Sequence, residues 1–399
     1  MKLHVFGATD KGLKRKTNED AYLIDSEHGL FVVCDGMGGH LAGEVAAQLA
    51  IETISNTVKN DENLKKIWNE GRACQHILLK AAENAILQAC SAVYKEARAK
   101  DELRGMGCTA TVLLIYGRKA AMAHVGDSSL FLCRDDETER LNATHTYAAD
   151  LVRAGAITRE QAVQSRYANV LTRSLGTHES VQCDKLVLDV LPDDVFLLCS
   201  DGLSRYLESD NQLTSYLSDD LPESANELVA YANSCGGKDN TTVVVVQAEA
   251  ESFDPATDKK TRAIATRLST LRKVELFQDL SLANLIRLAN MTRLEAFDEG
   301  QIAVSPAVTR GELYIVVDGK FAQMRDEGQI CSLAPGEAVG YEGLFGSNTW
   351  RTNLVATTDG TLASLDGAKF RKLLRRRPWL GVKLLLRLSQ HLITQKQSV

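Results

Sequence analysis

Five short apolar runs do most to limit how the N-terminal part of this chain can fold. Each is rich in valine, leucine and isoleucine and is bounded by glycine, aspartate or asparagine, which is typical of buried β-strands. Two longer segments, 44–58 and 72–98, predict helices, and the second repeats apolar residues every three or four positions, so one face packs on a sheet. This part is therefore expected to be α+β. The predicted strands are 30–34, 109–116, 120–125, 195–199 and 241–246.

A change in character near residue 250 predicts a domain boundary. Residues 249–260 are polar, contain Pro255 and lack any periodicity. Beyond them we expect a helix over 261–271, then short strands separated by turn signals such as Asp298-Glu299-Gly300, then a basic amphipathic closing helix over 370–392. The 399 residues are thus divided into a domain at 1–248, a linker and connecting helix at 249–271, and a small β-roll or barrel with flanking helices at 272–399.

Composition excludes several classes of protein. Lysine and arginine total 46 against 52 aspartates and glutamates, and this net charge of −6 argues against a nucleic-acid binder. Nine cysteines without a CxxC pair predict a reducing compartment. The N-terminus reaches Asp10 before it builds an apolar signal segment, and no apolar run approaches the ~18 residues of a membrane span. We expect a cytoplasmic protein with no nucleic-acid or membrane partner.

Aspartates stand where the predicted strands meet loops. Gathering such acids at one sheet edge is costly, because like charges repel and burial adds to the cost, unless a divalent cation compensates. Oxygen-only ligands favour Mg²⁺ or Mn²⁺ over zinc. For any single aspartate an ordinary turn position is the alternative, but Gly36 and Gly202 add bends that let backbone carbonyls approach an ion. The aspartates are Asp20, Asp35, Asp127, Asp201 and Asp239.

Seven motifs occur in the order found in the metal-dependent protein phosphatases, the type 2C Ser/Thr phosphatases, and the chain resembles this family over about residues 1–248. The resemblance implies a central β-sandwich with helices on both faces, in agreement with the pattern of strands and helices. The motifs are Arg15-x-x-Asn18-Glu19-Asp20, Val33-Cys34-Asp35-Gly36-Met37-Gly38-Gly39-His40, Gly107-Cys108-Thr109-Ala110, Val125-Gly126-Asp127-Ser128, Leu171-Thr172-Arg173-Ser174-Leu175-Gly176, Cys199-Ser200-Asp201-Gly202-Leu203 and Lys238-Asp239-Asn240-Thr241-Thr242.

The resemblance also implies a metal-binding role for each acid. Asp35 resembles the aspartate that bridges two Mn²⁺ or Mg²⁺ ions, and Gly36 the residue whose carbonyl binds the second. Asp201 and Asp239 resemble the remaining ligands of the first ion, and Asp20 lies where the family holds the second. Bacterial members can hold a third ion, through the acids that Asp127 and Asp201 resemble.

The implied reaction is hydrolysis of phosphoserine or phosphothreonine on a protein by a metal-activated water. Arg15 resembles the arginine that holds the phosphate. His40 is a candidate proton donor to the leaving group, or a loop histidine that only caps or orients. The substrate is expected to be a phosphorylated protein such as a Ser/Thr kinase or its target, and residues 150–168 are expected to form a surface flap.

Two other functions stay open for the same residues. Cys199 and Arg205 fit the CxxGxxR loop of cysteine phosphatases, in which a thiolate attacks phosphorus. The usual histidine before that cysteine is Leu198, however, so the match is read as accidental. The other alternative is a catalytically idle module that senses a phosphoprotein or a nucleotide through the same scaffold.

The second domain resembles the cyclic-nucleotide-binding fold over about residues 272–396. In that family a Gly-Glu pair begins the phosphate cassette, its Glu binds the ribose and a later Arg binds the cyclic phosphate. Here Gly340 and Arg351 are in place, but Tyr341 stands at the glutamate position and Glu342 follows one residue later. Glu342 and Arg351 are the candidate nucleotide contacts, and a domain that kept the fold and lost the ligand is the alternative. The domain is expected to regulate or localise the phosphatase and to offer a homodimer seam.

Overall fold

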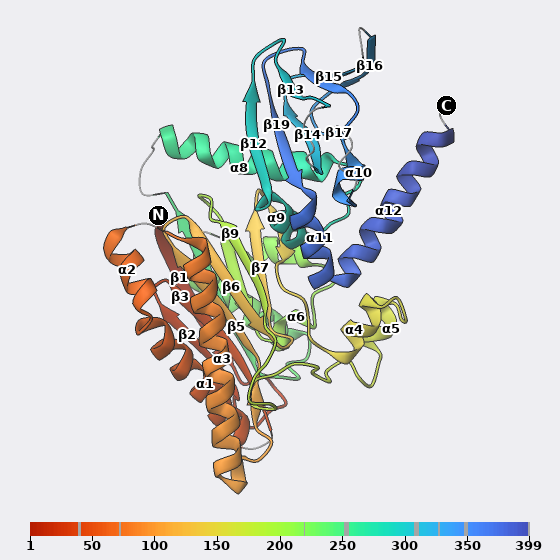
Figure 1. The fold of residues 1–399 in the computed structure, drawn as a ribbon. Helices are drawn as coiled ribbons and strands as arrows, with labels where there is room; N and C mark the ends of the chain where they lie inside the picture. Colours follow the sequence, from red (N-terminus) through yellow and green to blue (C-terminus); the bar gives the residue numbers. More distant parts are fainter. Residues whose placement is uncertain are drawn as a thin grey trace. The chain divides into compact units, whose positions relative to one another are not determined.

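The computed structural model describes residues 1–38, 41–71, 73–218, 220–250, 255–306, 311–325, 328–346 and 350–397. The chain divides into two compact units, Met1–Phe253 and Asp254–Val399, and each is considered by itself (Figure 1). Among the helices in these ranges, none combines the length and the apolar composition that a membrane crossing requires.

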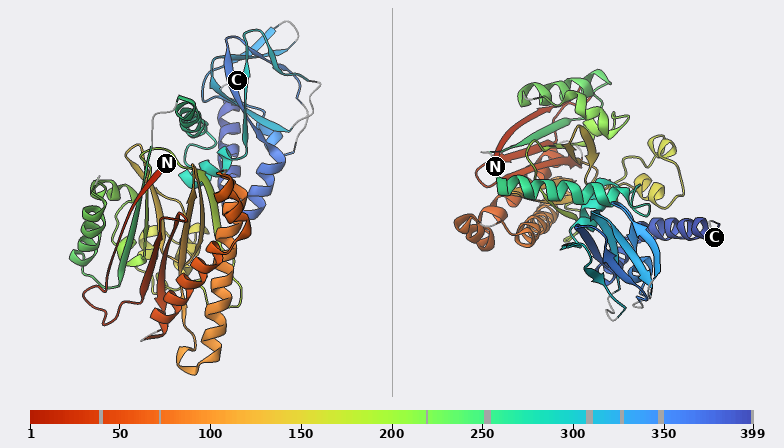
Figure 2. Two further views of the ribbon diagram at one scale, coloured as in Figure 1. Left: turned by 90° about the vertical axis from the view of Figure 1, so that its left-hand side faces the viewer. Right: turned by 90° about the horizontal axis from the view of Figure 1, so that it is seen from above.

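The first unit is a β-sandwich with helices on its outer faces, as predicted (Figures 1 and 2). One sheet has the order β1-β11-β10-β7-β8, and the other has the order β2-β3-β5-β6-β9, with β4 paired to β3. The strands are β1 (Lys2–Asp10), β2 (Asp20–Asp25), β3 (Leu30–Met37), β4 (Gly107–Cys108), β5 (Ala110–Tyr116), β6 (Lys119–Val125), β7 (Ser129–Arg134), β8 (Glu137–Arg140), β9 (Asp184–Asp189), β10 (Val195–Cys199) and β11 (Thr241–Glu249).

Helices cover both outer faces of the sandwich. The long helices α1 and α3 pack together on the sheet that contains β3 and β6, whereas α7 packs on β1 and β11. The helices are α1 (Leu41–Lys59), α2 (Glu62–Glu70), α3 (Gln75–Ala99), α4 (Tyr147–Arg153), α5 (Arg159–Val163), α6 (Asp201–Ser204) and α7 (Leu221–Ser234), with 3₁₀ turns at Asp101–Leu103 and Asp210–Tyr216.

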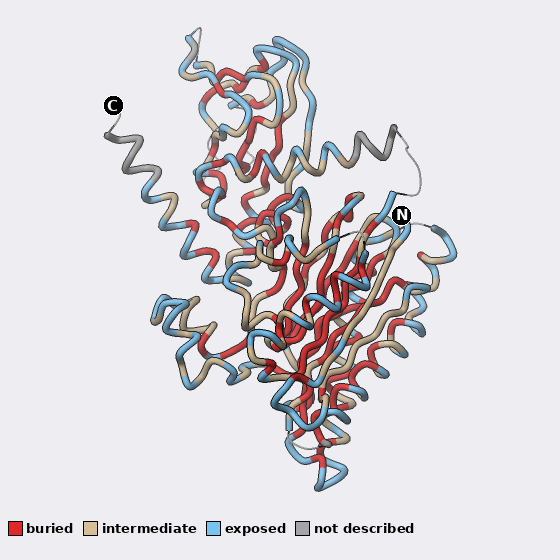
Figure 3. Tube along the Cα trace, turned by 180° about the vertical axis from the view of Figure 1, so that it is seen from behind, coloured by how far each residue is buried: buried red, intermediate tan, exposed pale blue. Residues whose placement is uncertain are grey.

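The central strands are buried on both faces, which explains why their sequences are continuous apolar runs (Figure 3). In β3, Val32 and Cys34 belong to the core beneath α1 and α3. Successive side chains of a strand point to opposite faces, so Phe31 and Val33 lie between the two sheets. All four side chains are fully buried.

The second unit contains two four-stranded antiparallel sheets and five helices among its described residues. The sheet orders are β12-β19-β14-β17 and β13-β18-β15-β16, which form the predicted β-roll. The elements are α8 (Pro255–Lys273), α9 (Leu282–Ala289), β12 (Thr292–Phe297), β13 (Ile302–Val304), β14 (Glu312–Asp318), β15 (Phe321–Arg325), β16 (Gly328–Leu333), β17 (Ala338–Val339), α10 (Tyr341–Leu344), β18 (Asn353–Ala356), β19 (Gly360–Asp366), α11 (Gly367–Arg376) and α12 (Pro378–Gln397).

Two local predictions need correction. The polar stretch 249–260 is not irregular throughout, because α8 begins at Pro255 and packs on α9 and β14. Proline suits the first turn of a helix, where its missing N–H is not needed. The single closing helix predicted over 370–392 is two helices, because Pro378 begins α12 and disfavours a helical conformation at Arg377.

Candidate metal centre

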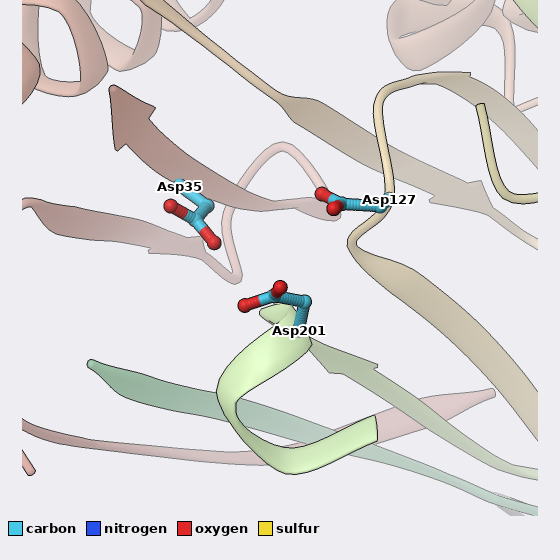
Figure 4. A group of neighbouring side chains, drawn as sticks. All are labelled: Asp35, Asp127 and Asp201. Carbon is cyan, nitrogen blue, oxygen red and sulfur yellow. The ribbon is translucent and has the colours of Figure 1, made fainter. Parts of the chain in front are cut away.

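Three carboxylates meet at one end of the sandwich (Figure 4). Asp35 lies in β3, Asp127 in the loop after β6, and Asp201 is the first residue of α6. One oxygen from each lies within 4.8 Å of the oxygens of the other two. The predicted strand-end aspartates therefore converge from segments that are far apart in the sequence, in an arrangement that can hold a cation.

Thr109 ties two of these segments together. Its hydroxyl accepts a hydrogen bond from the Asp35 amide at 2.9 Å, and its own amide donates to the Asp35 carbonyl at 2.9 Å. The same hydroxyl lies 2.7 Å from the hydroxyl of Ser128, the residue after Asp127. The Gly-Cys-Thr-Ala motif thus places a buried hydroxyl where it fixes the backbone on both sides of the centre.

Two buried histidines hold the turn that carries Asp127. The Gly126 amide donates to His145 Nδ1 at 3.1 Å, and the Gly126 carbonyl lies 3.0 Å from His124 Nε2. Nε2 of His124 must therefore carry the proton, and its Nδ1 accepts from the Thr111 hydroxyl at 2.9 Å. Gly126 has a φ of +112°, a backbone conformation that residues other than glycine rarely adopt. The hydrogen bonds with the two histidine rings hold the backbone in this conformation.

Asp20 lies beside the three acids, and only one of its two carboxylate oxygens accepts a hydrogen bond from the described residues. It is the cross-strand partner of Asp35 in the β2–β3 ladder. Its Oδ2 accepts from the Ser200 hydroxyl at 2.7 Å, whereas its buried Oδ1 has no hydrogen-bond partner among the described residues. Burial raises the pKa of Asp20 to about 7. A carboxylate oxygen that is buried without a partner fits a cation ligand better than a structural role.

Burial also raises the pKa of the three converging acids. The pKa of Asp35 is well above its ordinary value, and that of Asp127 is about 7, because of burial and of the neighbouring carboxylates. The pKa of Asp201 is raised by burial even though Arg205 opposes the rise. Burial therefore disfavours the charged form of these groups, and a hard divalent cation is the ligand that stabilises such an all-oxygen set in that form. The residues present fit Mn²⁺ or Mg²⁺.

Asp239 is held by two arginines at the edge of this cluster. The Arg15 guanidinium lies 2.8 Å from Asp239 Oδ1 and 2.9 Å from Oδ2. Arg205 donates to Asp201 Oδ2 and, at 3.2 Å, to Asp239 Oδ2. The Arg15 side chain is half exposed, whereas that of Arg205 is 24% exposed.

The two glycines that follow Asp35 and Asp201 are also required by local packing. A Cβ on Gly36 would lie 2.2 Å from the Gly43 carbonyl oxygen, and one on Gly202 would lie 1.9 Å from the Asn240 carbonyl oxygen. Both positions require glycine because another backbone segment packs against them. These close contacts bring α1 and the loop of Asp239 up to the centre.

The cysteine-phosphatase alternative is wrong. Cys199 is fully buried at the end of β10 within the core beneath α7. Burial raises the pKa of its thiol to about 12, so a nucleophilic thiolate is strongly disfavoured there. Arg205, the other end of that motif, instead contacts the acidic cluster.

Arg205 is the residue that sequence reasoning left without a role at this centre. The available signal was its spacing, since Asp201 and Arg205 are four residues apart, the distance at which helical side chains meet. The short helix α6 brings the two side chains into contact. His40, the candidate proton donor, lies outside the described residues.

The candidate nucleotide contacts lie in the second unit. Glu342 lies in the four-residue α10 and Arg351 precedes β18, and both are exposed. Tyr341, at the position where the family's glutamate is expected, instead packs against the apolar core of this unit. Trp350 contacts Tyr314 edge to face, with ring centroids 5.7 Å apart, and the Tyr314 hydroxyl donates to the buried Glu312 at 3.1 Å.

Comparison with protein families gives two matches. Residues 13–235 match the model of the protein phosphatase 2C family. Residues 294–377 match the model of the cyclic nucleotide-binding domain. The two matches lie in the two compact units.

Curated relatives and solved structures match the first unit. The serine/threonine protein phosphatase PstP of Mycobacterium tuberculosis is 34% identical over 237 residues, covering 59% of this chain and 43% of that protein. The chain therefore spans less than half the length of this relative. The serine/threonine phosphatase stp of Listeria innocua is 31% identical over 253 residues, covering 61% of this chain and 96% of that protein. The crystal structure of the PstP catalytic domain in complex with two manganese ions is 32% identical, with a TM-score of 0.54 over 62% of this chain and 99% of that one.

Proposed function

This chain belongs to the protein phosphatase 2C family, and from that membership we propose that it is a metal-dependent protein serine/threonine phosphatase. The observation that carries the proposal is the cluster of Asp35, Asp127 and Asp201, in which an oxygen from each lies within 4.8 Å of the others. Asp20 lies beside this cluster, and its buried Oδ1 has no hydrogen-bond partner among the described residues. The substrate class is a phosphorylated protein, and the finer proposal is a Ser/Thr kinase or its target. The PstP catalytic domain, solved with two manganese ions, supports Mn²⁺ or Mg²⁺ as the cofactor.

We assign the acids as follows. Asp35, Asp201 and Asp239 would hold the first ion, and Asp35 would share in holding the second with Asp20 and the Gly36 carbonyl. Asp127 and Asp201 are the candidates for a third. The convergence of Asp35, Asp127 and Asp201, the cross-strand pairing of Asp20 with Asp35, and the Arg205 contact that links Asp201 to Asp239 support this assignment.

The bound ions supply the Lewis acidity that lowers the pKa of a water molecule at the centre. The chain itself supplies position and charge. Thr109 fixes the backbone at Asp35, and the histidine pair fixes the turn at Asp127, so the ligand oxygens are held in place before substrate arrives. Water hydrolyses the ester directly, so no residue of the chain becomes phosphorylated.

Arg15 is proposed to bind the phosphate of the substrate. Its side chain is half exposed and its Nη2 bonds both carboxylate oxygens of Asp239, so Arg15 lies beside the cluster with access to solvent. A guanidinium that moves from a carboxylate to the phosphate oxygens neutralises their charge through paired hydrogen bonds. His40 keeps its proposed role as the proton donor to the leaving alkoxide.

The second unit is proposed to regulate or localise the phosphatase. Glu342 and Arg351 are its candidate nucleotide contacts, and the packing of Tyr341 against the core supports the alternative, a unit that has lost the ligand. Calorimetric titration of the full chain with cyclic AMP and cyclic GMP separates the two. Binding that is lost in Glu342→Gln and Arg351→Gln supports the contacts, and no heat with either nucleotide supports the alternative. The compartment is proposed to be the reducing cytoplasm, because all nine cysteines are free thiols.

The direct test is phosphate release from a phosphothreonine peptide by the full chain. We expect activity with Mn²⁺, none in excess EDTA, and a loss of at least a hundredfold in Asp201→Asn. Asp189→Asn is the matched control, because Asp189 also lies within two residues of a strand end and its side chain is 18% exposed against 16% for Asp201. Its partner, however, is Lys119, outside the acidic cluster. Activity that persists in EDTA, or equal losses in the two variants, would contradict the proposed function.

A further inference from the structure

Arg205 is anchored so that its guanidinium faces the acidic cluster. It directly follows α6, and its backbone amide donates to the Asp201 carbonyl at 3.1 Å. Its Nε donates to the same carbonyl at 3.2 Å. The backbone amide and the side-chain Nε of Arg205 are thus both held one helical turn after Asp201, and the charged end has little freedom to leave the cluster.

The two carboxylates that Arg205 bonds are the pair assigned above to one ion. Its Nη2 donates to Oδ2 of Asp201 and, at 3.2 Å, to Oδ2 of Asp239. Arg15 bonds Asp239 as well, but it comes from a loop and is half exposed, whereas three-quarters of the Arg205 side chain is buried. Arg205 is therefore the more firmly placed of the two positive charges.

We propose that Arg205 is an internal counter-ion of the metal centre: it bonds Asp201 and Asp239 in the ion-free protein and must release oxygens of both when Mn²⁺ binds. The inference rests on the proposed function, because that function assigns these two carboxylates to a cation. Arg205 is a positioning residue here, since it acts through the two ligands and not on the substrate.

This role has two consequences of opposite sign. In the ion-free protein the guanidinium compensates carboxylates that are otherwise crowded and partly buried, so it stabilises the fold. On ion binding, its hydrogen bonds to the ligand oxygens must break, and its positive charge repels the incoming cation. Removing Arg205 therefore lowers the stability of the ion-free protein and tightens the binding of Mn²⁺.

An arginine that only orients ligands predicts the reverse for ion binding. In that case the loss of Arg205 would leave Asp201 and Asp239 disordered, and Mn²⁺ would bind more weakly. A purely structural arginine would lower stability and leave the affinity for Mn²⁺ unchanged. The sign of the change in affinity distinguishes the three roles.

The experiment measures Mn²⁺ binding by calorimetry on chelator-treated full chain, and thermal unfolding in EDTA. Arg205→Gln removes the charge and keeps a polar side chain. Arg205→Lys keeps the charge but lacks the Nε donor that ties Arg205 to the Asp201 carbonyl, so its charge is held less firmly at the cluster. Arg153→Gln is the matched control, because Arg153 also bonds a nearby aspartate, Asp150, and is 32% exposed against 24% for Arg205.

We expect Arg205→Gln to bind Mn²⁺ about tenfold more tightly and to unfold several degrees lower in EDTA. Arg205→Lys is expected to bind about threefold more tightly, and it carries the test if the glutamine variant does not fold. Arg153→Gln is expected to bind as the wild type does. Equal or weaker binding by a folded Arg205 variant would overturn the inference while leaving the proposed function intact. A wild-type chain that binds no Mn²⁺ would overturn both.

Discussion

Acid is expected to destabilise the first unit through the buried histidines beneath Asp127. His124 is fully buried, and burial lowers its pKa to about 3, with a further contribution from His145. Its surroundings also include the carboxylate of Asp184, which raises the pKa, and the guanidinium of Arg140, which lowers it. Burial lowers the pKa of His145 as well. Both rings are therefore neutral in the folded protein at neutral pH.

The sign and size of the effect follow from the difference between the folded and unfolded states. Histidine in an unfolded chain has a pKa of about 6.5. Because the folded value is depressed, the stabilisation is complete above pH 6.5 and is lost as the pH falls toward 3. The full difference between the folded and unfolded pKa of His124 corresponds to about 5 kcal/mol in the free energy of unfolding. About 2 kcal/mol of this stabilisation is lost between pH 7 and pH 5.

The perturbation is His124→Gln, whose amide can still accept from Thr111 and donate to the Gly126 carbonyl but does not titrate. Urea unfolding at pH 8, 7, 6 and 5 is followed by tryptophan fluorescence in a background with Trp350→Phe and Trp379→Phe. Only Trp68 of the three tryptophans then remains, and it packs against the core of the first unit. The variant is expected to be about 1–3 kcal/mol less stable than its parent at pH 8.

Between pH 7 and pH 5 the parent is expected to lose about 2 kcal/mol more stability than His124→Gln. His76→Gln, an exposed histidine on α3, is the control and should retain the pH dependence of the parent. If His124→Gln and the parent lose stability equally between pH 7 and pH 5, the buried imidazole is not the source of the acid sensitivity.

Three further predictions concern other contacts. Thr109→Val removes the hydroxyl that bonds Asp35 and Ser128. The free energy of unfolding in urea should fall by about 1–3 kcal/mol, and calorimetry should show weaker Mn²⁺ binding. Thr109→Ser should restore both. Asp194→Ala leaves Arg134, whose side chain is 10% exposed, without its carboxylate, and should cost about 3–5 kcal/mol by thermal or urea unfolding; a loss under 1 kcal/mol would contradict the importance of that pair. Removing residues 254–399 should leave a folded phosphatase, because the matched segment covers 96% of the Listeria relative, and an unchanged rate and location of that fragment would argue against regulation by the second unit.

The strands were predictable from the sequence because the sandwich buries both faces of its central strands. The segment 195–199 coincides with β10, and 120–125 lies within β6. The predicted segment 30–34 is too short, because β3 continues through Asp35-Gly36-Met37 and pairs with β4 there. These three residues do not continue the apolar run, so the sequence pattern did not indicate a strand. The edge strand β1 was not predicted, since its residues are half-buried and mixed in character.

The candidate site was only partly predictable. The aspartates could be found because each lies within two residues of the end of a strand. The role of Arg205 could not be predicted, because it depends on a contact with Asp239, which lies 34 positions later in the sequence. Only the folded sheet brings these two residues together. Nor does the sequence reveal that Thr109 and the two histidines support the centre, since each acts through backbone groups of a distant segment.

The pairing of β1 with β11 has a consequence for how the first unit is made. The two strands pair along their whole length, from Lys2 opposite Glu249 to Asp10 opposite Thr241, and β11 also separates β1 from β10. During translation β1 leaves the ribosome first and has no partner in its sheet until more than 200 residues later. The sheet therefore closes only when β11 emerges, and Asp239 reaches the other acids at the same moment. Before that moment the nascent chain exposes an unpaired strand, and a chaperone that covers strand edges would act on it there.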